Sequence, residues 1–210
     1  MKAEDKIIIL ANGSFPSSQY GRMLLEEANQ IICCDEAADW LLSYGKEPDL
    51  IVGDMDSISG AVKERYNERL VEINEQETND LTKAVKYCMD KQIKEVVILA
   101  ATGLREDHTL GNISLLLEYN KGIKATMVTD HGEFSVLDNG EKVSSFPGEK
   151  ISFFSVDNNV TVTSEGLKYP LKNMQLYNWW RASLNETVSD SFVLHFKSEW
   201  PLILFRVRPL

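Results

Sequence analysis

Several features that mark common classes of protein are scarce or missing in this chain of 210 residues. Its three cysteines are odd in number and form no Cys-x-x-Cys pair, which excludes a zinc ribbon and favours buried thiols in a reducing compartment. No apolar run reaches the roughly 18 residues of a membrane span, so we expect no membrane association and a cytoplasmic protein. The 22 basic residues are outnumbered by 32 acidic ones, and the net charge of −10 opposes binding to nucleic acid.

Two nucleotide-binding motifs are also missing. The chain has no Gly-x-x-x-x-Gly-Lys-Ser/Thr segment, which excludes a Walker phosphate-binding loop, and no Gly-x-Gly-x-x-Gly segment, which disfavours a dinucleotide-binding fold. Hydrophobic residues nevertheless make up 43% of the chain, which is enough for a folded core. An acidic protein can still bind a small polyphosphate if a metal ion mediates the contact.

Strand-like and helix-like segments alternate over the first 130 residues. Short apolar runs predict buried strands at residues 6–11, 31–34, 50–52, 70–73, 95–100 and 124–128. Helical spacing of apolar residues predicts helices at 21–30, 36–44, 61–69, 81–88 and 110–117, with Gly45 as the C-cap of the second. This alternation is typical of an α/β domain with a mostly parallel sheet and helices on both faces.

The pattern changes near residue 130, after which no convincing amphipathic helix occurs. Alternating apolar residues predict strands at 134–137, 151–156, 160–162, 192–196 and 202–207. Asp138-Asn139-Gly140 is a hairpin signal, and Pro147-Gly148 is a second turn. We therefore expect two domains, an α/β domain at 1–130 and an all-β sandwich at 131–210.

Polar turns follow several predicted strands of the first domain. They are Asn12-Gly13, Asp35, Asp54-Met55-Asp56 and Thr102-Gly103. Because the carboxyl ends of parallel strands meet at one edge of the sheet, where ligands bind in such folds, these turns together predict a site. In an extended backbone Asp54 and Asp56 would project from the same side of the chain and could share a divalent metal ion, although an isolated Asp-x-Asp is more often a polar turn.

Two helix starts add further polar groups. Thr78, Asn79 or Asp80 can serve as an N-cap, but Glu77 and Asp80 can also add carboxylates to Asp54 and Asp56. We expect the Thr82 hydroxyl and the Lys83 amine on the exposed side of the first turn, where a phosphate would also find free N–H groups.

The second helix start is the segment 102–112. Arg105 precedes the predicted helix and suits bidentate phosphate contact. Asp107 can cap the helix or ligate metal, and His108 and Asn112 project from one helix face. Polar groups this dense between a strand and a helix favour a functional site over a purely structural one.

These residues, in this order, resemble the thiamine pyrophosphokinase family nearly from end to end. The matching motifs are Asp35 with Ala37 and Ala38, Pro48-Asp49 before Gly53–Ser57, Asn79–Lys83, Gly103–His108 with Asn112, Ser164–Leu171 and Ser183–Glu186. The chain has Met55 where the family often has Phe, Glu77 where Asp is common, Asn79 where Thr is common, and Tyr169 where many members have Trp.

The resemblance implies an α/β nucleotide-binding domain, a β-sandwich domain and a homodimer with thiamine at the subunit interface. It implies transfer of the pyrophosphoryl group of ATP to the thiamine hydroxyl, with release of AMP. Under the hypothesis of such an enzyme, we expect Mg²⁺ to be held by Asp54, Asp56, Glu77, Asp80 and Asp107. We expect ATP to be bound by Asn12, Gly13, Asp35, Thr82, Lys83, Arg105, His108 and Asn112, and thiamine by Ser164, Tyr169, Ser183 and Asn185.

Within this interpretation, Asp54, Asp56, Asp80, Asp107, Lys83 and Arg105 form the catalytic set. Trp179-Trp180 lies outside the matching motifs and has no predicted role. Two alternatives stay open from the residues: a related transferase that acts on another small alcohol, such as a pterin or a nucleoside, and a non-catalytic sensor of thiamine or nucleotide.

Overall fold

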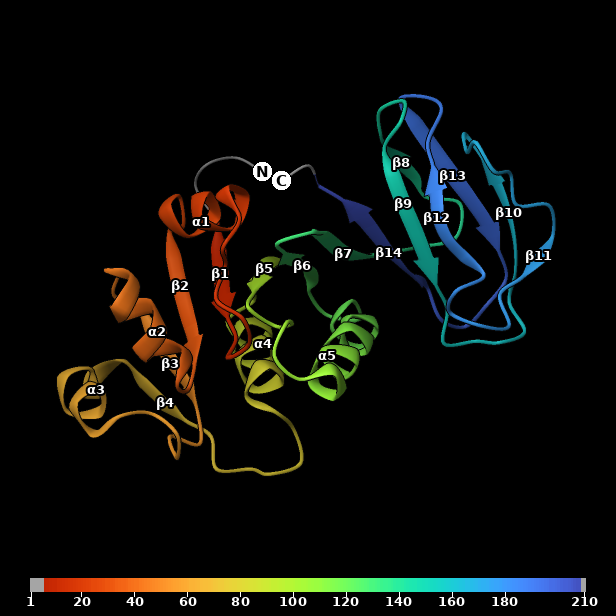
Figure 1. Cartoon of the computed structure of the whole chain (residues 1–210). Helices are drawn as coiled ribbons and strands as arrows, with labels where there is room; N and C mark the ends of the chain where they lie inside the picture. The colour runs from red at the N-terminus through yellow and green to blue at the C-terminus, as the bar shows by residue number, and fades with distance from the viewer. Residues whose placement is uncertain (1–5, 209–210) are drawn as a thin grey trace. The chain divides into compact units, whose positions relative to one another are not determined.

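The computed structural model describes residues 6–208, so residues 1–5 and 209–210 of the two predicted domains lie outside the described residues. The chain forms two compact units, of which the first ends at Asp130 and the second begins at His131 (Figure 1). Within the described residues no helix is long and apolar enough to cross a membrane.

The first unit alternates strands and helices, as predicted. In chain order its elements are β1 (Ile7–Leu10), α1 (Gln19–Glu26), β2 (Gln30–Cys34), α2 (Ala37–Tyr44), β3 (Leu50–Gly53), α3 (Gly60–Arg65), the 3₁₀ turn η1 (Asn67–Arg69), β4 (Leu70–Glu72), α4 (Asp80–Asp90), β5 (Glu95–Leu99), α5 (Glu106–Tyr119) and β6 (Lys124–Thr129). The strand order is β6-β5-β1-β2-β3-β4, and every neighbouring pair is parallel, which confirms the predicted parallel sheet.

Helices cover both faces of this sheet. Alternate strand residues such as Ile8 and Ile31 pack in one apolar cluster with side chains of α1, α2 and α3, including Leu25 and Leu41. Helix α4 packs over β1, β2 and β3 on the opposite face, where it buries Val85. Successive strand residues point to opposite faces, so the apolar runs of β1, β2, β3 and β5 are buried on both sides, whereas the edge strand β4 is not.

Local sequence signals set the helix ends. Gly45 has a φ of 96° and ends α2, with its N–H donated to the carbonyl groups of Leu41 and Leu42, as the sequence predicts. Asn79 is the N-cap of α4, where its side chain accepts a hydrogen bond from Thr82 N.

The second unit contains no helix between residues 131 and 208. Its strands are β7 (Gly132–Leu137), β8 (Lys142–Ser144), β9 (Lys150–Phe154), β10 (Thr161–Glu165), β11 (Met174–Gln175), β12 (Ala182–Glu186), β13 (Ser191–Phe196) and β14 (Leu202–Val207). They form two antiparallel layers, with strand orders β12-β9-β14-β7 and β11-β10-β13-β8.

The inner faces of these two layers share one apolar core, which confirms the predicted sandwich. Phe153 of β9 and Phe192 of β13 meet there with ring centroids 5.8 Å apart. Both side chains are buried. The short strands β8, β11 and β12 were not predicted, since β8 and β11 have only two or three residues and β12 contains polar residues and a bulge.

The predicted hairpin at Asp138-Asn139-Gly140 is wrong. The turn forms, but β7 before it pairs with β14, whereas β8 after it pairs with β13 in the other layer. Strand β13 holds the turn, because Gly140 N donates to Leu194 O at 2.9 Å and Asn139 Oδ1 accepts from Phe196 N at 2.8 Å. The turn therefore moves the chain between layers instead of reversing it within one.

Asp130, the last residue of the first unit, fixes the start of α1. Its carboxylate accepts hydrogen bonds from the backbone N–H of Ser17 and Ser18 and from the Ser17 hydroxyl. Burial alone would raise the pKa of Asp130, but these hydrogen bonds outweigh burial and lower the pKa. The ionised carboxylate therefore stabilises the folded unit.

We predict that Asp130→Asn lowers the free energy of unfolding at pH 7 by about 1 kcal/mol, because charged hydrogen bonds become neutral ones. The folded-state pKa is below the unfolded value of about 3.9, so the contribution is complete above that value and is lost as the pH decreases through the folded pKa. Urea titrations at a series of pH values should show the two proteins converging in acid. A difference that stays constant down to about pH 3 would contradict this role.

Candidate functional site

A cavity of about 300 Å³ lies in the first unit at the carboxyl ends of β1, β2 and β5. The residues after these strands line it: Asn12 and Gly13 after β1, Asp35 after β2, and Thr102 after β5. Asn79 and Asp80 at the start of α4, and Arg105, His108 and Asn112 at the start of α5, line it as well. The structure thus brings the predicted turns together at one edge of the sheet.

The backbone at this edge adopts conformations that most residues avoid. Asp35, Met55 and Ala100 have φ values of 45°, 65° and 54°, although none of them is glycine. Such left-handed residues cost free energy and are concentrated at functional sites. Each follows a different strand of the parallel sheet.

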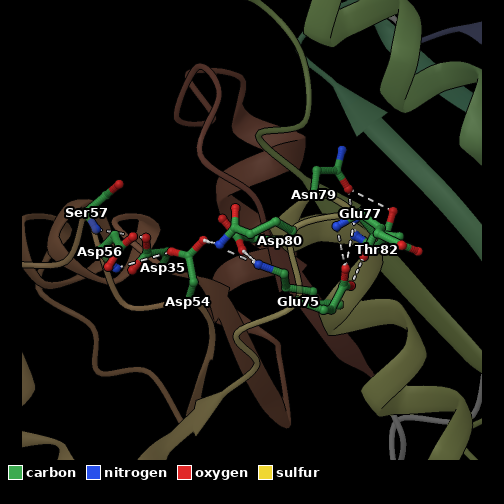
Figure 2. Close-up of polar contacts among 12 residues, drawn as sticks. Asp35, Asp54, Asp56, Ser57, Glu75, Glu77, Asn79, Asp80 and Thr82 are labelled. Atoms are coloured by element: carbon green, nitrogen blue, oxygen red, sulfur yellow. Dashed lines mark hydrogen bonds and ion pairs between the residues drawn. The ribbon is translucent and has the colours of Figure 1, made fainter.

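Three aspartates form the chemical centre of the site (Figure 2). Asp35 follows β2, Asp54 follows β3 and Asp80 begins α4, and one carboxylate oxygen from each lies within 4.8 Å of the others. Asp35 is only 4% exposed, and its Oδ1 atom has no hydrogen-bond partner among the described residues. Its Oδ2 atom accepts a hydrogen bond from Ser57 N at 3.1 Å.

A buried ammonium group partly compensates these carboxylates. Lys83 Nζ lies 2.9 Å from Asp80 Oδ1 and 3.5 Å from Asp54 Oδ2, and its side chain is only 2% exposed. Burial acts to lower the pKa of Lys83, but the hydrogen bond to Asp80 and the charges of Asp80 and Asp54 outweigh it, so the pKa is raised. Lys83 therefore stays charged.

The aspartates themselves differ in their acidity. Hydrogen bonds from Asp56 N and the Gln76 side chain lower the pKa of Asp54. Burial raises the pKa of Asp35, Ser57 N partly opposes this, and the charges of Asp80 and Asp54 raise the pKa further. Asp35 thus has a desolvated carboxylate oxygen that accepts no hydrogen bond from residues 6–208.

Asp56 and Glu77 do not belong to this group in the structure. The expected extended backbone at Asp54-Met55-Asp56 is wrong, because Met55 takes a left-handed conformation and its side chain packs in the core. Asp56 N then donates to Asp54 Oδ1 at 3.2 Å, and the Asp56 side chain is exposed. Glu77 is exposed in the loop before α4, where its N–H donates to Glu75. Asp35, predicted as an ATP residue, instead completes the cluster with Asp54 and Asp80.

Thr82 and Lys83 are buried, which contradicts their expected position on the exposed side of α4. Helix α4 packs broadly on the sheet and leaves little of its first turn in solvent. The Thr82 hydroxyl lies 2.8 Å from both Asn79 Oδ1 and Tyr119 Oη. Asn79 Nδ2 in turn donates to Asn112 Oδ1 at 3.0 Å, so this network joins the starts of α4 and α5.

At the start of α5, Arg105 and Asp107 pair with each other. Arg105 Nη2 lies 2.6 Å from Asp107 Oδ2, and both side chains are mostly exposed. The hydrogen bond from Arg105 and then that from His108 N lower the pKa of Asp107 to about 2. Asp107 is not among the three clustered carboxylates, and its predicted metal contact stays a prediction. His108 and Asn112 both line the cavity, as expected for one helix face.

The turn after β1 fits only glycine at its tightest point. Gly13 N donates to Ala100 O at 2.6 Å. A Cβ atom at Gly13 would lie 2.4 Å from Ala100 O and 2.6 Å from Thr102 O. The backbones of the turns after β1 and β5 therefore lie in close contact at Gly13. Beside them, Asn12 Nδ2 donates a hydrogen bond to Glu36 Oε2 at 2.9 Å.

The residues assigned to thiamine lie in the second unit. Ser164 Oγ accepts from Leu171 N at 2.8 Å, and Asn185 bonds the backbone of Tyr169. Tyr169 is 59% exposed. The Ser183 hydroxyl donates to Trp180 O at 2.7 Å. Trp179 packs against Phe154, with ring centroids 5.8 Å apart, which gives this previously unassigned residue a structural contact.

Comparison with known families decides the relationship. Residues 22–127 match the family described as thiamin pyrophosphokinase, catalytic domain, and residues 132–203 match thiamin pyrophosphokinase, substrate-binding domain. This chain belongs to the thiamin pyrophosphokinase family. A thiamine pyrophosphokinase of Bacillus subtilis is 30% identical over 158 residues, covering 68% of this chain and 70% of the relative. A relative from Caenorhabditis elegans, thiamin pyrophosphokinase 1, is 26% identical over 171 residues, covering 73% and 69%.

Solved structures of the family have the same fold. The thiamin pyrophosphokinase of Candida albicans superposes with a TM-score of 0.81 at 19% identity, covering 98% of this chain and 90% of that one. The Bacillus subtilis thiamine pyrophosphokinase gives a TM-score of 0.78 at 26% identity, covering 98% and 100%.

The donor set of this thiamin pyrophosphokinase family member fits a divalent cation such as Mg²⁺. Such hard cations prefer carboxylate oxygens, and Asp35, Asp54 and Asp80 offer these within a short distance of one another. The Asp35 oxygen without a partner is the observation that favours a cation at this place, since a desolvated carboxylate atom needs positive charge.

Sequence reasoning missed two contributors to the site. Gln76 donates to Asp54 Oδ2 at 3.2 Å, and no local pattern distinguishes it from other loop residues. Ser57 positions Asp35 through its backbone N–H, so its side-chain type gives no signal.

We predict that Gly13→Ala destabilises the protein by about 1–3 kcal/mol, because the added methyl group overlaps backbone carbonyl groups that cannot move independently. Gly111→Ala is the matched control. Gly111 lies in α5, and a Cβ there would have no atom within 4 Å apart from its chain neighbours and the backbone of its own helix. Alanine should therefore stabilise that helix by about 0.5–1 kcal/mol. Urea unfolding of both variants tests the contrast, and equal effects would contradict the proposed close approach.

Proposed function

We propose that this protein transfers the pyrophosphoryl group of ATP to the hydroxyl of thiamine, giving thiamine diphosphate and AMP. The observation that supports this best is the group of three carboxylates, one with an unpaired buried oxygen, beside a cavity at the carboxyl edge of a parallel sheet. Membership of the thiamin pyrophosphokinase family supports the same activity. It favours this activity over a transferase for another alcohol or a non-catalytic sensor.

The two units would bind different substrates. We propose residues 1–130 as the ATP- and metal-binding catalytic domain and residues 131–210 as the thiamine-binding and dimerisation domain. Asn12, Gly13, Asp35, His108 and Asn112 support the first assignment because they line the cavity. The homodimer is proposed from the family resemblance. The cytoplasm is the proposed compartment, supported by the three buried, unbridged cysteines.

Asp35, Asp54 and Asp80 would hold Mg²⁺, and the wider set with Asp56, Glu77 and Asp107 stays a prediction from the resemblance. When bound, the ion would offset negative charge on the phosphate oxygens. The protein itself would supply positive charge through Lys83, which is buried and held charged by two aspartates. Arg105, which also lines the cavity, would add a second cation that can bind two phosphate oxygens.

In the reaction, the thiamine hydroxyl oxygen bonds to the β-phosphorus of ATP as the bond from that phosphorus to the α-phosphate oxygen breaks. AMP leaves with the electron pair of that bond. The hydroxyl proton needs an acceptor, and we propose Asp56, whose exposed side chain lies in the same turn as Asp54. Rate enhancement in such transfers comes mainly from positioning and charge stabilisation, which is what His108 and Asn112 would provide by orienting ATP.

The activity is tested by incubating the protein with ATP, Mg²⁺ and thiamine and separating the products. Thiamine diphosphate and AMP should form in equal amounts, since each transfer yields one of each. Formation of ADP and thiamine monophosphate, or no product with Mg²⁺ or Mn²⁺, would overturn the proposal. A pterin or nucleoside in place of thiamine should give no pyrophosphorylated product.

We predict that Asp54→Asn lowers kcat by about two orders of magnitude or more, since one electrostatic stabiliser of the reacting phosphates is weakened. The fold should be retained, because Asn keeps an oxygen for the hydrogen bond from Asp56 N. Asp90→Asn, at the exposed end of α4, is the control and should keep wild-type turnover. Wild-type turnover in Asp54→Asn would disprove the role of this carboxylate.

A further inference from the structure

We infer that Asn185 is a positioning residue that holds Tyr169 in place for the substrate, instead of a residue that contacts the substrate. The identity of that substrate rests on the proposed function. The hydrogen bonds between Asn185 and the backbone of Tyr169 lie within the second unit, so they can be tested without any substrate.

The side chain of Asn185 forms hydrogen bonds with backbone groups. Its Oδ1 atom accepts from Tyr169 N at 3.2 Å and from Glu186 N at 2.8 Å, and its Nδ2 atom donates to Tyr169 O at 2.8 Å. A side-chain amide has two donor hydrogens and one oxygen with two lone pairs. Both lone pairs and one hydrogen are therefore used, and Asn185 is only 4% exposed.

A bulge in β12 explains how Asn185 reaches the loop that contains Tyr169, which is the segment 166–173 between β10 and β11. The register of β12 against β9 shifts between Ala182 and Asn185, and Leu184 within the bulge has a φ of 58° and is 83% exposed. Bulges commonly turn a side chain toward a new partner. Here Leu184 points to solvent and its neighbour Asn185 is buried against Tyr169.

Other hydrogen bonds hold the same loop on both sides of Tyr169. Lys168 N donates to Glu186 O at 2.8 Å, and Val188 N donates to Gly166 O at 3.0 Å. After Tyr169, Leu171 N donates to Ser164 Oγ at 2.8 Å, and Ser164 N donates to Leu171 O at 3.0 Å. The loop is therefore fixed to β10 and β12 before any ligand binds.

The fixed loop presents an aromatic ring to solvent. Tyr169 is 59% exposed although both its backbone N–H and C=O are paired by Asn185. The Lys168 ammonium lies 5.8 Å from the centroid of its ring, so a cation already approaches this ring. A cationic heterocycle such as the thiazolium of thiamine would be attracted in the same way. Because the backbone of Tyr169 is already fixed, binding to its ring has a lower ordering cost.

Hydrogen exchange in the ligand-free protein tests the positioning directly. In Asn185→Ala the amide of Tyr169 should lose most of its protection, whereas the amide of Leu171, bonded to Ser164, should keep its own. Asn139→Ala is the matched control, since it removes another asparagine that accepts a backbone N–H, that of Phe196, and it should leave Tyr169 protected. Unchanged protection of Tyr169 in Asn185→Ala would overturn the inference.

Kinetics with a double variant separate positioning from direct contact. Tyr169→Ala and Asn185→Ala should each raise the KM for thiamine roughly 3- to 30-fold, the range expected for a lost cation–π contact, with kcat nearly unchanged. If Asn185 acts through Tyr169, the double variant should have the KM of Tyr169→Ala alone. A KM equal to the product of the two separate effects would show direct contact and overturn the inference.

The ligand-free wild-type protein covers the case in which the alanine variant does not fold. Its Tyr169 amide, bonded to Asn185 Oδ1, should be protected from exchange, as should the amide of Leu171, which is bonded to Ser164 Oγ. Fast exchange at Tyr169 in the absence of thiamine would overturn the inference. Absence of any thiamine turnover by the wild-type protein would disprove the proposed function, and the exchange measurement would still decide the role of Asn185.

Discussion

Repulsion among gathered carboxylates is the constraint on which the first unit depends. Asp35, Asp54 and Asp80 approach within 4.8 Å, and only the Lys83 ammonium lies among them in the part of the chain that the structure describes. Burial makes this arrangement costly, as the raised pKa of Asp35 shows. The fold must therefore hold the three side chains together by packing, and a cation relieves the cost.

The parallel sheet supplies that restraint. Each aspartate follows or begins a different element, so that no local chain motion can separate all three at once. Gly53 permits the close approach, because a Cβ there would lie 3.0 Å from Asp35 Cβ and 3.4 Å from Asp80 Cγ. The left-handed conformations of Asp35 and Met55 add local strain that the rigid sheet and the packed helix α4 can sustain.

The sequence predicts the architecture well, because periodicity and turn residues are local signals. The order of strands and helices, the change near residue 130 and the Gly45 cap are confirmed. Predictions from the sequence fail where contacts between residues far apart in the chain determine the local structure. Met55 packs in the core, and the exposed Asp56 carboxylate stays outside the cluster of Asp35, Asp54 and Asp80. Thr82 and Lys83 are buried by contacts of α4 with the sheet. The Asp138-Asn139-Gly140 turn joins two layers because β13 binds it. No local pattern contains these partners.

The position of β1 in the strand order has a practical consequence for dissecting the protein. The catalytic-domain match covers residues 22–127, yet β1 at Ile7–Leu10 lies between β2 and β5 in the middle of the sheet. A fragment cut at the borders of the match would lack this central strand and expose two unpaired strand edges, which promote aggregation. It would also lack Asp130. Limited proteolysis or recombinant expression of the first unit should therefore aim for a piece that begins before β1 and ends after Asp130.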